Sequence, residues 1–131
     1  MKKLVLAFLV IFALSSFYKA KTLKGVWQYA GGITKGKYYP APKDYQQQRR
    51  YTDNQFEAFL LEAGQQPLKY ESGNYTIKND TCLETQTFSL QGQQMMGLTV
   101  RYWHTVRNDT LILKGILPNG AAIEDYWKKV K

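Results

Sequence analysis

The sequence is poor in the side chains that build disulfide, metal and redox sites. It contains one cysteine, Cys82, and one histidine, His104. A lone cysteine excludes an intramolecular disulfide, so the fold must depend on its hydrophobic core. One imidazole cannot form a multi-histidine metal site, and a mixed site with Glu84 and Asp125 would be incomplete. Phosphate loops, hydrolase elbows and paired cysteines are also missing. We therefore expect no catalytic residue, no metal and no cofactor.

Long hydrophobic runs are also scarce. The one run, Leu4–Leu14, follows Met1-Lys2-Lys3 and precedes Ser15-Ser16. It is shorter than the roughly 20 residues that span a bilayer. A basic start, a short apolar segment and small residues are typical of a secretory signal peptide, although a buried or anchoring helix is the alternative. We predict a signal peptide over 1–20, cleaved after Ser15 or Ala20, and export to the periplasm or the medium.

The rest of the chain, 21–131, is long enough for one domain. The formal charge of +8 overstates its basicity, because the signal peptide carries three of the eighteen lysines and arginines against ten acidic residues overall. The remaining positive charges are scattered. This pattern indicates solubility rather than nucleic-acid binding. We expect a monomer with no nucleic-acid partner and no membrane-spanning segment after cleavage.

Alternating apolar and polar residues predict a succession of antiparallel strands between Tyr75 and Trp127. Three of the joints, Asn79-Asp80, Asn108-Asp109 and Pro118-Asn119-Gly120, have residues that favour tight hairpin turns. The fourth joint, 91–97, is a longer loop.

Upstream, we predict strands over Lys24–Tyr29, Gln55–Glu62 and Leu68–Glu71. The stretch Gly31–Arg50 shows no clear period and is predicted as an excursion with a helical turn near Lys43–Gln48. Strands and turns at this spacing predict an all-β fold, either a sandwich or an antiparallel up-and-down barrel of about eight strands.

The turns also predict which residues share the inner face. Two-residue turns pair Ile77 with Cys82 and Val106 with Leu111, and a three-residue loop pairs Leu111 with Trp127. A simple connection at 91–97 would pair Glu84 with His104. One end of the face is then an apolar floor consisting of Ile77, Cys82, Val106, Leu111 and Trp127. The rest carries Tyr75, Glu84, Gln86, Tyr102, His104 and Asp125.

Such a face has more than one interpretation. It is typical of a ligand cavity with an apolar floor, yet the polar groups could equally satisfy one another or reach solvent at a barrel mouth. A Glu–His or Asp–His pair could also act as general acid and base, but no nucleophile accompanies it.

The segment Gly25-Val26-Trp27 resembles the Gly-x-Trp signature that opens the first strand of lipocalins and of calycins similar to fatty-acid-binding proteins. With the blocks 51–57 and 73–80, the mature chain resembles a bacterial family of small, exported lipocalin-like proteins of undefined function. The resemblance implies a barrel closed at one end by Trp27 against Lys128 or Lys129, with Trp127 beside them. The third lipocalin motif is missing, which favours a calycin relative over the lipocalin family proper.

Two functions follow from this sequence. The first is binding of a small hydrophobic or amphipathic ligand, its polar end at the polar residues of the inner face and its apolar part on Val106, Leu111 and Ile77. The second is a packed barrel that docks onto an envelope partner or glycan through Gly31–Arg50, with an aromatic rim consisting of Tyr38, Tyr39, Tyr45 and Tyr51.

Overall fold

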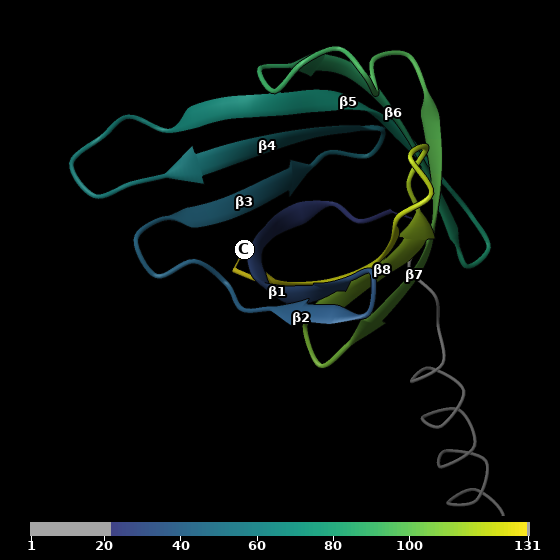
Figure 1. Ribbon diagram of the computed structural model, residues 1–131, viewed down its shortest axis with the longest axis horizontal. Coiled ribbons are helices and arrows are strands. Elements are labelled where there is room, and N and C mark those ends of the chain that lie inside the picture. Colours follow the sequence, from purple (N-terminus) through teal and green to yellow (C-terminus); the bar gives the residue numbers. More distant parts are fainter. Residues whose placement is uncertain (1–21, 131) are drawn as a thin grey trace, which may run out of the picture.

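The computed structural model describes residues 22–130, which form nine β-strands and no helix (Figure 1). The predicted signal peptide lies outside the described residues. The strands are β1 (Gly25–Thr34), β2 (Lys37–Tyr39), β3 (Gln46–Tyr51), β4 (Gln55–Leu61), β5 (Leu68–Lys78), β6 (Thr81–Ser89), β7 (Thr99–Arg107), β8 (Thr110–Ile116) and β9 (Ala122–Lys129).

Eight of these strands close into an antiparallel barrel. Each strand from β3 to β9 pairs with the next, and β1 closes the ring by pairing with both β3 and β9. The short β2 pairs only with the far part of β1 and lies outside the ring. The predicted all-β up-and-down barrel is therefore confirmed (Figure 1). No helix within residues 22–130 is long and apolar enough to cross a membrane.

The tight turns set the register as predicted. Asn79, Asn108 and Asp109 have positive φ angles of 57°, 51° and 59°, the left-handed conformation that such turns need. The predicted pairs are present: Ile77 with Cys82, Tyr75 with Glu84, Val106 with Leu111, His104 with Leu113, Leu111 with Trp127, Leu113 with Asp125, and Lys114 with Glu124.

The predicted register between β6 and β7 is wrong. Glu84 pairs with Val100 rather than with His104. The β6–β7 ladder ends at Thr85 and Thr99, and the connection between them is held by its own contacts, including the bond from Gly97 N to Gln86 O. The connection is therefore much longer than a simple loop. The error is an even number of residues, so the predicted inner face is unchanged, and Glu84 and His104 are both buried.

The predicted excursion over Gly31–Arg50 is also wrong. β1 continues to Thr34, turns through Lys35 and Gly36 into β2, and β3 begins at Gln46. The predicted helical turn at 43–48 is replaced by a bend and the start of β3. The predicted strands at Leu68–Glu71 and from Tyr75 belong to one long strand, β5. Alternation was hidden in β3 because its inward residues, Gln47 and Arg49, are polar.

One end of the barrel, here called the packed end, is filled by buried side chains: Leu23, Trp27, Tyr51, Tyr75, Cys82 and Leu111. Trp27 is 3 % exposed and its indole Nε1 donates to Leu23 O at 2.8 Å. Lys129 Nζ lies 5.7 Å from the centre of the Trp27 ring. Trp27 and a late-strand lysine thus meet as the resemblance implies. Val106, in contrast, is 45 % exposed, because it lies at the last ladder positions before the Asn108 turn, and it does not belong to the floor.

Candidate functional site

A cavity of about 300 Å³ occupies the opposite half of the barrel, here called the cavity end. Its lining combines an apolar wall with aromatic and charged groups. The apolar wall consists of Phe56, Met95, Leu98, Val100, Leu117 and Ile123. The aromatic and polar wall consists of Tyr29, Tyr70, Tyr102, Trp127, Gln47, Arg49, Glu71, Glu84, Gln86 and Asp125.

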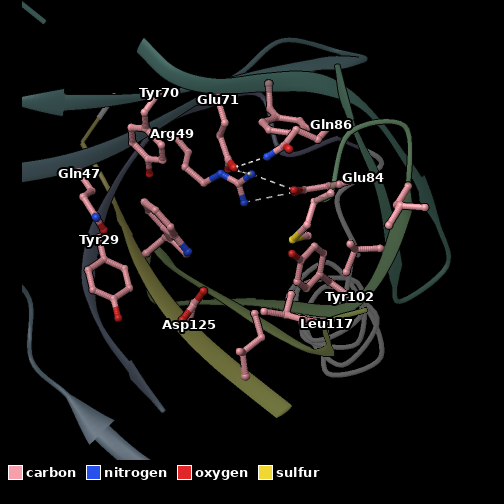
Figure 2. A pocket seen from close by; sticks show the side chains of 16 residues that line it. Tyr29, Gln47, Arg49, Tyr70, Glu71, Glu84, Gln86, Tyr102, Leu117 and Asp125 are labelled. Carbon is pink, nitrogen blue, oxygen red and sulfur yellow. Dashed lines mark hydrogen bonds and ion pairs between the residues drawn. The ribbon is translucent and has the colours of Figure 1, made fainter. Parts of the chain in front are cut away.

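Arg49, on β3, is the centre of the polar wall. Figure 2 shows its guanidinium between Glu71 and Glu84. Nη2 lies 3.1 Å from Glu71 Oε1 and 2.8 Å from Glu84 Oε1, and Nη1 lies 3.4 Å from Glu84 Oε2. Tyr51 Oη donates to Glu84 at 2.8 Å, and Gln86 Nε2 donates to Glu71 at 2.8 Å. Both glutamates are thus fully engaged by protein donors.

Aromatic rings surround the same guanidinium. Arg49 Cζ lies 5.5 Å from the ring centre of Tyr51, 4.6 Å from that of Phe56 and 5.6 Å from that of Trp127. Burial opposes its charge most strongly, but Glu84, Tyr51, Glu71 and Tyr102 together outweigh burial and hold the pKa of Arg49 well above its ordinary value. Arg49 is therefore a permanent buried cation.

Asp125, on β9, is a third acid on the cavity wall. Its backbone pairs with Leu113 on β8 and with Gly32 on β1. A Cβ at Gly32 would lie 2.6 Å from Asp125 Oδ1 and 2.8 Å from Tyr29 Oη, so only glycine leaves room for both groups. Burial raises the pKa of Asp125 from 3.8 to about 6, while the charge of Arg49 opposes this rise and the charge of Glu84 adds to it. Within residues 22–130 its carboxylate forms no hydrogen bond or ion pair, and it faces the cavity across from Glu71 (Figure 2).

Two buried N–H groups of lining residues also have no acceptor among the described residues. They are Arg49 Nε and Trp127 Nε1, on side chains that are 6 % and 4 % exposed. Buried donors are nearly always hydrogen-bonded in proteins, so their occurrence side by side on one wall is unusual. Neighbouring side chains cover both nitrogens, so they are an unfavourable feature of the packing behind the wall and do not face the cavity.

The thiol and the phenol groups near the site stay protonated. Burial raises the pKa of Cys82 far above its ordinary value, so its thiol, 3.8 Å from Glu84 Oε2, stays protonated and is no nucleophile. Burial likewise raises the pKa of Tyr70 to about 12 and that of Tyr102 further. The phenols are therefore hydrogen-bonding groups and not acids.

The structure brings together four of the six predicted ligand-binding residues. Glu84, Gln86, Tyr102 and Asp125 line the cavity. Tyr75 lies at the packed end, where its hydroxyl accepts a bond from Leu23 N at 3.1 Å. His104 is buried away from the cavity, and its backbone N donates to Asp80 O at 2.9 Å.

The predicted barrel-closing tryptophans, Trp27 and Trp127, are both buried, and Trp127 also lines the cavity. The predicted Glu84–His104 pair is not formed, since Glu84 pairs with Val100. Of the predicted rim tyrosines, Tyr51 is instead a core residue, while Tyr38 and Tyr39 are exposed on β2.

Sequence reasoning missed Arg49 and Glu71, the two residues that organise the site. Arg49 fell in the predicted excursion and Glu71 at the end of a predicted short strand. The usable signal was the alternation Gln47, Arg49, Tyr51, which places three large side chains on one face of a strand. A buried charge in that pattern is visible only once its partners on β5 and β6 are known.

Neither a metal site within residues 22–130 nor a match to a known family identifies the function of this site. No group of three His, Cys, Asp or Glu side chains within residues 22–130 is arranged to hold a metal ion. No family model matches the sequence, and no curated protein is significantly similar to it.

Proposed function

We propose that this protein is an exported binding protein that holds a small amphipathic molecule in its barrel cavity. Ligand pockets begin at roughly 300 Å³, and the cavity of about 300 Å³ reaches that size. Its wall has the composition such sites share, an apolar surface with a few polar groups that converge on it. The predicted signal sequence supports export.

The observation that carries the proposal is the composition of the cavity wall. Its apolar side chains lie beside the buried ion pairs of Arg49 with Glu71 and Glu84, and beside the carboxylate of Asp125, which forms no ion pair within residues 22–130. A purely structural interior would be filled by apolar side chains, because a buried polar group without a partner costs about 1–3 kcal/mol. The carboxylate of Asp125 therefore marks where the polar part of a ligand binds.

The apolar wall supplies the second half of an amphipathic site. Val100 is 5 % exposed, and Leu117 and Ile123 pack against the core from the same side. Burying a ligand chain against these residues contributes about 25 cal/mol per Å² of apolar area removed from water. Affinity therefore comes mainly from the apolar wall, and orientation from the polar groups that line the cavity.

The alternative, an interaction module, has less support. The segment predicted as its docking loop is mostly strand, and its exposed aromatic residues are Tyr38 and Tyr39 on β2. An interaction module was expected to have a solidly packed barrel. This barrel contains a cavity, which favours ligand binding. The binding experiment described next can also decide in favour of the interaction module.

A displacement assay with a fluorescent apolar dye tests the proposal, using octanol, octylamine and octanoate as competitors. We expect saturable binding of at least one of them. Leu117→Trp fills the cavity and should abolish binding. Ile116→Trp, at the neighbouring position that is 65 % exposed on the outer face, is the matched control and should leave binding unchanged. Absence of saturable binding by the folded protein, or equal binding by both variants, would overturn the proposal and favour the interaction module.

A further inference from the structure

The charged groups on the cavity wall do not balance. Among residues 22–130, Arg49 is the one cation that lines the cavity, against the three acids Glu71, Glu84 and Asp125. Arg49 forms ion pairs with Glu71 and Glu84, so its charge is already shared. Asp125 is left without an ion pair among the described residues. The interior is therefore net negative, and an anion such as a fatty-acid carboxylate would be repelled.

We propose that the ligand is an organic amine whose ammonium group binds against Asp125, with its carbon chain on the apolar wall. This inference rests on the proposed function and names the class of ligand. A bound ammonium would supply the ion partner that Asp125 lacks, because a partly buried carboxylate is stabilised by an opposite charge within hydrogen-bonding distance.

Aromatic rings surround the same position. Asp125 and Trp127 project to the same face of β9, because they are two residues apart. Tyr29, paired with Trp127 in the barrel, contacts its ring edge-to-face with centroids 5.2 Å apart. Tyr29, Tyr70 and Tyr102 line the same cavity as Asp125, and the charge of Asp125 contributes to the raised pKa values of all three. Ring faces attract ammonium groups, and a carboxylate with tyrosine and tryptophan rings is a combination that recognises amines.

A metal cation fits the wall less well than an amine. The carboxylates of Glu71 and Glu84 are occupied by Arg49, Gln86 and Tyr51, so Asp125 would be a lone ligand. An ammonium needs only one carboxylate together with hydrogen-bond acceptors and ring faces.

The test is calorimetric titration of the whole mature protein with octylamine, octanol and octanoate near neutral pH. The three compounds share one chain length and differ in the charge of the head. We expect octylamine to bind at least about tenfold more tightly than octanol, and octanoate to bind most weakly. Octanoate binding as tightly as octylamine would overturn the amine assignment while leaving the proposed function intact. If none of the three compounds binds, both the amine assignment and the proposed function are overturned.

Two variants assign the effect to Asp125. Asp125→Asn keeps the shape and removes the charge, so octylamine should lose about tenfold in affinity while octanol is unchanged. Glu124→Gln removes the neighbouring acid, which pairs with Lys114 on the outer face, and should change neither. An Asp125→Asn variant that retains full preference for octylamine would contradict the proposal.

The pH dependence gives a second readout. Octylamine stays protonated below neutral pH, while Asp125 takes up a proton near pH 6, so binding should weaken as the pH falls through about 6. The charged and titratable groups that face Asp125 from the other strands are Tyr29, Arg49, Tyr70, Glu71, Glu84 and Tyr102. Asp125→Asn should flatten the profile in this range. If octylamine binding by the Asp125→Asn variant keeps the same pH dependence, another acid takes up the proton. That result would contradict the role of Asp125.

Discussion

The packed end and the cavity end of the barrel treat their polar atoms in opposite ways. At the packed end, the indole of Trp27 donates to Leu23 O, and the Tyr75 hydroxyl bonds both Leu23 N and Thr52 O. At the cavity end, the carboxylate of Asp125, Arg49 Nε and Trp127 Nε1 lack hydrogen-bond partners among residues 22–130. Strands β1, β5 and β9 contribute to both ends, so the difference lies in the side chains and not in the backbone.

This difference separates residues that stabilise the fold from residues that cost stability. A hydrogen-bonded polar group in a core stabilises the fold or leaves its stability unchanged. A polar group without a hydrogen-bond partner lowers the stability of the fold. Natural proteins keep such penalties mainly at functional sites. Substitutions at the packed end should therefore destabilise the protein, and neutralising an unpartnered group at the cavity end should stabilise it.

Arg49, which lies between the two ends, should give the largest loss. Arg49→Met leaves Glu71 and Glu84 buried without a cation, and breaking such a pair costs about 3–5 kcal/mol of unfolding free energy. Urea denaturation measures it. Arg50→Met is the control, because Arg50 projects outward over Phe59, 4.2 Å from its ring centre, and should lose less than about 1 kcal/mol. Equal losses of unfolding free energy in the two variants would show that the buried ion pairs of Arg49 contribute no more to stability than the outward-facing Arg50 does.

Trp27 tests the packed end directly. Trp27→Ala should cost about 3–5 kcal/mol, since it removes a buried aromatic ring. Trp103 is the matched control because it is 51 % exposed on the outer face of β7, and Trp103→Ala should stay within about 1 kcal/mol of wild type. Thermal and urea unfolding both report the difference. A mild Trp27→Ala effect would mean that this end is loosely packed.

A pair of tyrosines compares the ends at the level of one hydroxyl. Tyr75→Phe leaves Leu23 N without its acceptor at the packed end, so we expect a loss of about 1–3 kcal/mol. Tyr70→Phe, on the same strand at the cavity end, removes a hydroxyl that forms no hydrogen bond within residues 22–130 and should cost roughly 0.5 kcal/mol or less. If Tyr70→Phe cost more stability than Tyr75→Phe, the distinction between the packed end and the cavity end would be wrong.

Asp125→Asn should give a smaller effect than the substitutions of Arg49 and Trp27, and an effect of the opposite sign. The raised pKa of Asp125, from 3.8 to about 6, means that the folded state binds this proton more tightly than the unfolded state does. The linked stability is present at low pH and is lost as the pH rises from about 4 to about 6. Near neutral pH, Asp125→Asn should therefore stabilise the ligand-free protein by about 1–2 kcal/mol, after allowance for partial exposure. The gain should vanish below about pH 4, and a gain that persists there would have another cause.

The sequence was most informative where a single turn decides a register. Asn79-Asp80, Asn108-Asp109 and Pro118-Asn119-Gly120 each allow few backbone conformations, and the pairs around them were predicted correctly. The β6–β7 connection has no such constraint. Its path depends on contacts such as Gly97 N to Gln86 O, and the pairing of Glu84 was therefore wrong.

The site was predictable only in part for a related reason. Side-chain alternation placed Glu84, Gln86, Tyr102 and Asp125 on the inner face, and all four line the cavity. Arg49 could not be placed, because a charged residue inside a barrel contradicts the hydrophobic pattern by which strands are found. Its burial depends on two glutamates that are 22 and 35 residues away in sequence.

The closure of the ring between β1 and β9 constrains the order of folding. Trp27 pairs with Lys129, so the ring cannot close before almost the whole described chain has left the ribosome. Hairpins such as β8–β9 join neighbours in sequence and can form early, whereas β1 must wait for its second partner. Contacts this distant in sequence slow folding and leave edge strands exposed in the meantime. The slow step in assembly of this barrel should therefore be the joining of β9 to β1.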